Sequence, residues 1–283
     1  MNNKNKIKKT LKQHLINLGF KFFDSYDQYD LWKEYCFEKK NIPIGVKNKY
    51  TMFLKKNAIN RNYRLENDFY DLIGKHKELM IITHSKKSNE IFNSGLHVVS
   101  ELKENSNILD VGCNSGYLTS FYAKIFSSSS FIGFDKSKHT ILQGLKMFNF
   151  KKYSNLVLSY DCEILKKNKF NFIIDTQCFS NLKNKELLSL LHLLSYCSHV
   201  NVRMISISNL RNEEETRIFL KIFEKKSFYV KSITAILVET LYGVVAYTKI
   251  IFTKKKIEKG YDLKSYFNDI RKKISVVNFF NLN

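Results

Sequence analysis

Short apolar segments alternate with amphipathic segments from about residue 107 to residue 253. The short segments are rich in β-branched and aromatic residues, a composition typical of strands buried in a sheet. They predict strands at 107–113, 131–135, 155–160, 170–175, 200–207, 229–238 and 243–253. The amphipathic segments predict helices at 117–126, 138–148, 185–196 and 213–225. This alternation is typical of a doubly wound α/β fold, in which helices cover both faces of a mostly parallel sheet.

The last two predicted strands differ from the others because no helix separates them. A connection as short as 239–242 joins antiparallel neighbours, whereas a parallel pair needs a crossover of a dozen or more residues. We therefore expect the final pair to be antiparallel. The remaining residues, 254–283, are expected to form a basic tail with one helix at about 263–274.

Residues 1–100 show helical apolar spacing and contain no recognisable phosphate loop, metal cluster or catalytic triad. The apolar positions of the first two patterns are Ile7, Leu11, Leu15 and Phe20, then Tyr26, Leu31, Tyr35 and Phe37. Two further helical patterns cover 69–79 and 91–102, and Gly74 and Gly95 are expected to mark breaks there. The sequence thus predicts a mainly helical N-terminal cap that selects the substrate at 1–100, a cofactor-binding sheet domain at 101–253, and the tail.

The chain is strongly basic, with a formal net charge of +21 over 283 residues. Such a charge suits nucleic-acid binding, but only six of the 47 basic residues are arginines. Arginine is the residue that binds phosphate bidentately, and asparagine and isoleucine are also abundant here. We therefore favour a general compositional drift toward lysine over selection for RNA binding, which stays open.

Cysteine usage and hydropathy bear on the cellular location. The five cysteines are odd in number and none has the CxxC spacing of zinc or redox sites, so we expect reduced thiols, no metal site and a cytoplasmic protein. The N-terminal residues show no apolar signal-peptide core, and none is expected. The apolar run 233–252 contains charges and a central glycine, which favours two strands over a membrane helix.

One stretch, Asp110-Val-Gly-Cys-Asn-Ser-Gly116, carries the clearest chemistry. Gly112 and Gly116 allow a sharp turn and close approach of a ligand, and the N–H groups that open the next helix favour a carboxylate. Asp110, at the strand exit, would face a positive group of the same ligand. A dinucleotide fingerprint needs G-x-G-x-x-G, whereas these glycines are spaced G-x-x-x-G, so a dehydrogenase is disfavoured.

Two further acids stand at the next two strand exits. Asp135 lies about twenty residues beyond Gly116, where a carboxylate can accept both hydroxyls of a ribose. Asp161 can accept the exocyclic amine of adenine, and the backbone of Cys162 can reach a ring nitrogen. Each acid alone has the alternative role of a helix cap, but three at successive strand exits are harder to explain in that way.

Residues from about 105 to 253 resemble the class I S-adenosylmethionine-dependent methyltransferases. The resemblance lies in Leu109–Gly116, Gly133-Phe134-Asp135, Asp161-Cys162 and Phe172–Asp175, although the family usually has glycine where Asn114 stands. It implies a seven-stranded sheet whose last strand is antiparallel, and S-adenosylmethionine as the cofactor. The residues then expected to bind the cofactor are Asp110, Gly112, Cys113, Asn114, Gly116, Tyr117, Asp135, Lys136, Asp161, Cys162 and Asp175.

The fourth strand exit, from Asp175 to Asn181, would border the methyl group and the substrate, with Gln177 and Phe179 as substrate contacts. Enzymes that methylate amines of bases or glutamine amides have an Asn/Asp-Pro-Pro-aromatic motif there, and this chain has no proline after Pro43. No cysteine follows a proline, so we expect Cys178 to be packing and not a nucleophile. No catalytic residue is assigned.

These observations predict a methyltransferase that acts on an oxygen or nitrogen of a small-molecule acceptor, with no membrane partner. The alternatives are an RNA methyltransferase that binds phosphates through its lysines, and a non-catalytic methyltransferase-like partner subunit. The sequence fixes neither the acceptor nor the oligomeric state.

Overall fold

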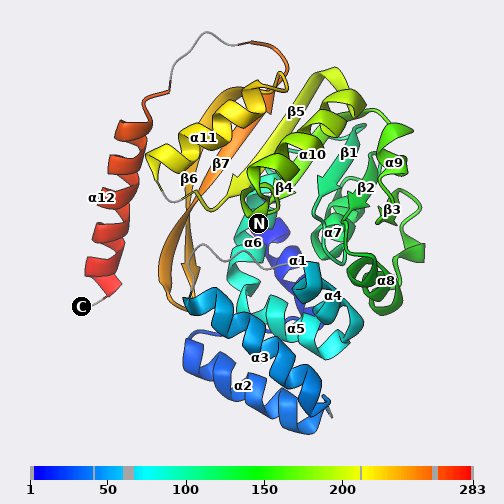
Figure 1. The fold of residues 1–283 in the computed structure, drawn as a ribbon, viewed down its shortest axis with the longest axis vertical. Coiled ribbons are helices and arrows are strands. Elements are labelled where there is room, and N and C mark those ends of the chain that lie inside the picture. The colour runs from blue at the N-terminus through cyan, green and yellow to red at the C-terminus, as the bar shows by residue number, and fades with distance from the viewer. Residues whose placement is uncertain (1–2, 41, 60–66, 211, 257–260, 282–283) are drawn as a thin grey trace.

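The structure is a computed structural model that describes residues 3–40, 42–59, 67–210, 212–256 and 261–281. Its centre is a seven-stranded sheet of order β3-β2-β1-β4-β5-β7-β6 (Figure 1). The strands are β1 (Asn107–Val111), β2 (Ser130–Phe134), β3 (Leu156–Ser159), β4 (Phe170–Thr176), β5 (Ser198–Ser208), β6 (Tyr229–Thr240) and β7 (Gly243–Thr253). β7 is antiparallel to both of its neighbours, and the other adjacent pairs are parallel. The predicted fold class is confirmed.

Alternate residues of each strand face opposite sides of the sheet, so two separate cores form. On one side, Leu109 and Ile173 pack with helices from the C-terminal half of the chain. These helices are α9 (Glu163–Lys166), α10 (Asn184–Cys197), α11 (Glu213–Glu224) and α12 (Leu263–Asn281). On the other side, Ile108 and Ile174 pack with α1 (Asn3–Asn17), α6 (Ser88–Val99) and α7 (Tyr117–Ile125). The N-terminal region therefore completes one face of the sheet.

The tail predicted at 254–283 packs on the last strands. Leu263 joins the core that α10 and α11 form with the sheet, and the Tyr261 hydroxyl donates a 2.8 Å hydrogen bond to the Val230 carbonyl of β6. Residues 257–260 of that tail lie outside the described residues.

A separate aromatic core holds the outer part of the N-terminal region. Its helices are α2 (Tyr26–Lys39), α3 (Ile44–Ile59), α4 (Asn67–Lys75) and α5 (Lys77–Lys86). The rings at its centre belong to Phe37, Tyr50, Phe53 and Phe69, which contact one another in edge or stacked pairs. Stacked and edge-to-face rings stabilise a core beyond their buried area.

Several expectations for this region are wrong. Leu31 and Tyr35 are exposed on α2, because the face that packs inward is the one carrying Tyr29, Cys36 and Phe37. Gly95 lies inside α6 and does not break it, whereas the pattern 69–79 is interrupted one residue after Gly74, where α4 ends at Lys75 and α5 begins at Lys77. A Cβ on Gly95 would lie 2.9 Å from Leu118 of α7, so this glycine allows two helices to approach closely. The helix α3 has no counterpart among the sequence predictions.

Helix α4 lies against α8 (Lys138–Met147), which follows β2 (Figure 1). A Cβ on Gly74 would lie 2.5 Å from the Thr140 nitrogen, so only glycine permits this approach. The Thr140 hydroxyl donates to the Tyr70 carbonyl at 3.2 Å, and the Ser137 hydroxyl donates to Asp71 at 2.9 Å. These contacts hold the N-terminal region over the end of β2. Among the described helices, none combines the length and the apolar character needed to span a bilayer.

Replacement of Gly74 by alanine tests this packing. Gly74→Ala should lower the free energy of unfolding by about 1–3 kcal/mol, because backbone atoms of α8 cannot move away cheaply. The matched control is Gly45→Ala in α3, where an added Cβ meets nothing within 4 Å. That variant should be neutral or more stable by up to about 1 kcal/mol. Equal stability of the two variants in urea unfolding would contradict the packing.

Candidate cofactor-binding site

The turn after β1 has three residues in the left-handed region. Gly112, Asn114 and Gly116 have φ values of 68°, 54° and 80°. The nitrogens of Gly112 and Cys113 both donate to the Phe134 carbonyl at the end of β2, at 2.7 and 3.2 Å. Gly116 then begins α7, so the free N–H groups of the helix point back to the turn.

Both glycines of the turn are packed closely by neighbouring segments. A Cβ on Gly112 would lie 2.4 Å from the Cβ of Cys178, which follows β4. A Cβ on Gly116 would lie 2.6 Å from a methyl of Leu158 on β3. The backbone of the turn is thus enclosed by the ends of β3 and β4, and any larger residue would force these segments apart.

Asp110 is buried near the end of β1, directly before the turn. Its Oδ2 accepts a 2.6 Å hydrogen bond from the Thr119 hydroxyl, and its Oδ1 has no partner among the described residues. Burial, with the nearby charges of Asp175 and Asp135, raises the pKa of Asp110 to about 7. A buried carboxylate oxygen without a partner is costly unless a cation meets it.

Asp135 follows β2 and holds the same turn from the other side. Its Oδ2 accepts from the Asn114 nitrogen at 3.0 Å, and its Oδ1 accepts from the Ser137 nitrogen at 2.9 Å. Each oxygen keeps a second lone pair, which a ribose hydroxyl can use. Burial raises the pKa of Asp135. The neighbouring Lys136 is exposed and lies 3.6 Å from Glu186, so its amine points to a helix end.

Asp175, near the end of β4, is fully buried. It accepts hydrogen bonds from the nitrogens of Cys178 and Phe179, at 2.7 and 3.0 Å, and from the Ser206 hydroxyl at 2.5 Å. Burial raises its pKa to about 7. These bonds show that Asp175 holds the turn after β4 in place.

The two predicted substrate residues differ in their surroundings. Gln177 is half-buried at the edge of the sheet, with a φ of 67° and a nitrogen that donates to the Ile207 carbonyl. Phe179 is fully buried, with its ring centroid 5.6 Å from that of Phe223. Its ring packs between η2 (Phe179–Asn181) and α11, where Phe179 also lines a pocket at the ends of β4 and β5, so its role as a substrate contact stays a prediction.

Asp161 and Cys162 are exposed after β3. Asp161 accepts a 3.0 Å hydrogen bond from the Glu163 nitrogen at the start of α9, as a helix cap does. The structure thus brings Asp110, Asp135 and Asp175 within electrostatic range of one another, with Cys113 buried among them. Asp161 stands apart from this group, although it lies at the same edge.

His84 of α5 reaches the turn; the sequence offers His76 and His84 as histidines of the cap that could reach the pocket, but it assigns neither a role. Its Nε2 lies 2.8 Å from Asn114 Oδ1, which also accepts from the Ser115 nitrogen at 2.8 Å. Burial lowers the pKa of His84 to about 4, so the ring is neutral at physiological pH. Because Asn114 presents its oxygen to both groups, the neutral ring must carry its proton on Nε2 and donate it.

The helices of the N-terminal region also enclose the site. The ring centroids of His84 and Tyr117 are 4.9 Å apart, and Phe20 packs on both rings. Burial raises the pKa of Tyr70 on α4, as do the charges of Cys178 and Asp135, so this side chain lies beside the acids. Water therefore has limited access to the turn.

These groups fit S-adenosylmethionine. The unpaired Oδ1 of Asp110 suits its ammonium group, and the glycine backbone at the start of α7 suits its carboxylate. The free lone pairs of Asp135 suit its ribose hydroxyls. The roles of the predicted residues in cofactor binding stay predictions, and these residues are Asp110, Gly112, Cys113, Asn114, Gly116, Tyr117, Asp135, Lys136, Asp161, Cys162 and Asp175.

Comparison with known proteins supports the same class. Residues 51–161 match the family model described as Protein-L-isoaspartate(D-aspartate) O-methyltransferase (PCMT). Comparison with curated proteins gave no significant match.

Three solved structures are similar to the chain. One is a TehB-like SAM-dependent methyltransferase from Corynebacterium glutamicum, with 15% identity, coverage of 64% of this chain and 98% of that chain, and a TM-score of 0.49. Another is the ribosomal protein L11 methylase from Lactobacillus delbrueckii subsp. bulgaricus, with 14% identity, coverage of 59% and 79%, and a TM-score of 0.46. A third is magnesium protoporphyrin IX methyltransferase from Synechocystis PCC 6803, with 14% identity, coverage of 62% and 83%, and a TM-score of 0.44.

The strand order, the turn after β1 and the family match together define a class of protein. They support a class I S-adenosylmethionine-dependent methyltransferase with S-adenosylmethionine as its cofactor. The match at 51–161 begins within α3, spans α4 to β3, and ends before β4.

Substitution of His84 tests its role as a positioning residue. His84→Leu should weaken binding of S-adenosylhomocysteine about five- to tenfold in calorimetry, because Asn114 loses one donor. His84→Gln, which keeps an N–H donor, should restore most of the affinity. The control His192→Leu, at an exposed position of α10, should bind as the wild type does. Equal affinities of the Leu and Gln variants would contradict the proposed hydrogen bond.

The raised pKa of Asp110 predicts a pH dependence. Pairing with the ligand ammonium favours the ionised acid, so binding releases a proton and tightens as pH rises through about 7. Calorimetric titration with S-adenosylhomocysteine between about pH 6 and 7.5 should show this trend, since an α-amino group stays charged there. Asp110→Asn should bind more weakly and without the trend, while exposed Asp269→Asn should keep it. An unchanged pH profile in Asp110→Asn would refute the pairing.

Proposed function

We propose that this methyltransferase transfers a methyl group from S-adenosylmethionine to an oxygen or nitrogen of a small-molecule acceptor. The observation that carries the proposal is a cavity of about 590 Å³ at the ends of β4 and β5. Its size falls within the range of roughly 300–1,000 Å³ that small-ligand pockets occupy. The parallel strands end at the same edge as β1, so the cavity and the cofactor turn share one side of the sheet.

The cavity adjoins the cofactor turn through the segment after β4. Cys178, which contacts Gly112, immediately precedes η2, and η2 forms one wall of the cavity. The opposite wall is the start of α11. The lining mixes apolar and polar side chains, which include Leu210, Ile218, Ser180, Asn184, Asn212 and Glu214. Such a lining can bury an organic molecule and orient it by hydrogen bonds.

The residues of this chain have mainly to position two molecules. When bound, the cofactor supplies a methyl group on a positively charged sulfur, which is already activated for transfer. The turn at Gly112–Gly116 holds one molecule, and the walls of the cavity hold the other in line with it. Such positioning lowers a reaction barrier by several kcal/mol, and by roughly 7–11 kcal/mol in the best intramolecular cases. The helices α4 and α5 exclude water from the same edge.

An RNA acceptor is the alternative, and the enclosure of the site favours the small molecule. The helices α4 and α5 lie over the turn, held by the Tyr70 carbonyl that accepts from Thr140 and by His84 that donates to Asn114, which leaves a folded RNA little access from the side of β1 and β2. The family matched at 51–161 is described as an O-methyltransferase, which supports oxygen as an acceptor atom.

The acceptor class is tested by labelled-methyl transfer from S-adenosylmethionine to cell extract separated into small-molecule, RNA and protein fractions. We expect the label in the small-molecule fraction. Label in RNA or protein would refute the proposal, and failure to bind S-adenosylhomocysteine would favour a non-catalytic subunit.

A variant that fills the cavity tests its role. Ile218 is partly exposed and lines the cavity from α11, so Ile218→Trp should reduce methyl transfer at least tenfold by occupying the acceptor volume. Binding of S-adenosylhomocysteine should stay unchanged. The control Lys221→Trp, on an exposed position of α11 outside the lining, should keep activity. Full activity of Ile218→Trp would show that the acceptor binds elsewhere.

A further inference from the structure

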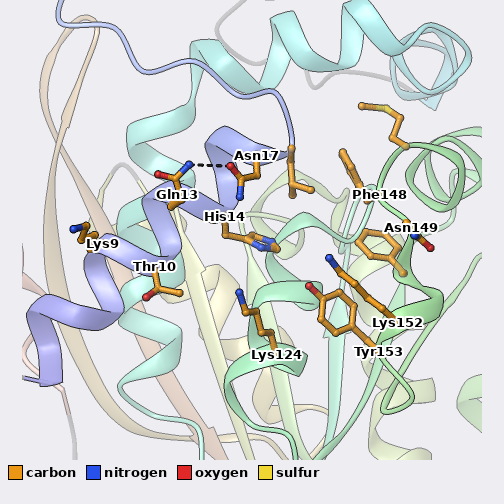
Figure 2. A pocket seen from close by; sticks show the side chains of 13 residues that line it. Lys9, Thr10, Gln13, His14, Asn17, Lys124, Phe148, Asn149, Lys152 and Tyr153 are labelled. Atoms are coloured by element: carbon orange, nitrogen blue, oxygen red, sulfur yellow. Dashed lines mark hydrogen bonds between the residues drawn. The ribbon is translucent and has the colours of Figure 1, made fainter.

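A second pocket lies away from the cofactor edge, between α1 and the C-terminal ends of α7 and α8 (Figure 2). Its volume is about 500 Å³, and the short helix η1 (Phe150–Lys152) forms its remaining wall. α7 begins at the cofactor turn and ends at this pocket. The nine residues of α7 separate the two sites by roughly 12 Å, at 1.5 Å per residue.

The lining of this pocket is basic. Lys9, Lys124 and Lys152 line it, and none of its thirteen lining residues is an aspartate or glutamate. In the part of the chain that the structure describes, none of these three lysines pairs with an acid. Thr10, Gln13, Asn17 and Asn149 add neutral hydrogen-bonding groups. A concave site with three unpaired ammonium groups attracts an anion more strongly than scattered lysines do.

Two of the three lysines converge on one point, and Lys9 points away from it. Figure 2 shows the amines of Lys124 and Lys152 and the hydroxyl of Tyr153 turned toward the ring of His14. The Lys152 amine lies 5.1 Å from the centre of the Tyr153 ring. His14 is itself committed, since its Nε2 lies 2.9 Å from the Tyr117 carbonyl and must donate to it. Burial lowers the pKa of His14 to about 4, and the charges of Lys124 and Lys152 lower it further.

The other side of the pocket is apolar. Leu18, Met147, Phe148 and Phe150 line it, and the rings of Phe148 and Phe150 lie 5.5 Å apart. An aromatic surface beside a basic one matches a nucleotide, because the base packs on rings while the phosphate meets amines. Free inorganic phosphate would leave the apolar half of the pocket unused.

We propose that this pocket binds a nucleotide phosphate, with the phosphate on Lys124 and Lys152 and the base against the phenylalanine side. The site is distinct from that of S-adenosylmethionine and does not depend on the identity of the methyl acceptor. The same chemistry has two sources, a free mononucleotide and a nucleotide within a single-stranded RNA.

The experiment uses the full chain saturated with S-adenosylhomocysteine, so that the cofactor site is filled. Calorimetry compares uridine 5′-monophosphate, uridine and a uridine decamer. We expect the monophosphate to bind and uridine to bind at least tenfold more weakly, because the phosphate contacts are lost. If the decamer binds no more tightly per site than the monophosphate does, the free nucleotide is the ligand. Tighter, strongly salt-dependent binding of the decamer identifies the RNA strand.

Variants locate the binding. Lys124→Ala/Lys152→Ala should weaken monophosphate binding by at least tenfold, and Lys124→Arg/Lys152→Arg should retain it. The control Lys146→Ala/Lys167→Ala removes the same charge from exposed positions outside the lining. All four lysines are exposed, so the midpoint temperature of thermal unfolding should be nearly unchanged in every variant. Absence of monophosphate binding, or equal weakening by the control pair, would overturn the proposal.

Discussion

The close approach of three chain segments at the end of β1 is the constraint on which the rest of the structure depends. The backbone of Gly112 and Gly116 contacts Cys178 after β4 and Leu158 on β3, at distances that exclude any Cβ. The same constraint extends to Gly144 of α8, where a Cβ would lie 2.2 Å from the Ser115 carbonyl oxygen. Interiors packed at this density tolerate little change, so the ends of the strands and α8 are fixed relative to one another. Asp110 and Asp135 are thereby held on opposite sides of one turn, and this separation lets one ligand meet both.

Asn114 makes this turn depend on the N-terminal helices. An asparagine at positive φ is tolerated, but it brings a side-chain amide that must find partners in a buried place. Its oxygen finds them in the Ser115 nitrogen and in His84, thirty residues earlier in the chain. The cofactor turn and the cap are thus joined by a polar contact as well as by the packing of α4 on α8. Residues far apart in the sequence therefore shape the same site.

The sheet was predictable and much of the N-terminal region was not, for physical reasons. The strand runs are continuous and β-branched, so their apolar character is clear from the sequence alone. Of the three acids predicted at successive strand exits, Asp110 and Asp135 lie at the turn together with Asp175, while Asp161 is exposed. In α2 the apolar side chains do not lie on one face, so choosing Leu31 and Tyr35 gave the wrong side of the helix. The end of a strand fixes the place of Phe179 and leaves the direction of its side chain open. His84 could be named only as a histidine of the cap able to reach the pocket, since nothing near residue 84 indicates that a helix will carry it to Asn114.

The shared core on one face of the sheet has a consequence for dividing the chain. α1 and α6 supply Leu11, Leu15, Ile91 and Val98 to the core that contains Ile108, Ile174 and Ile205. A fragment that begins at residue 101 would leave these strand residues without their cover, although it would retain every strand and the whole glycine turn. The exposed apolar surface would favour aggregation. The N-terminal hundred residues are therefore a folding requirement of the catalytic sheet, whatever they contribute to the choice of substrate.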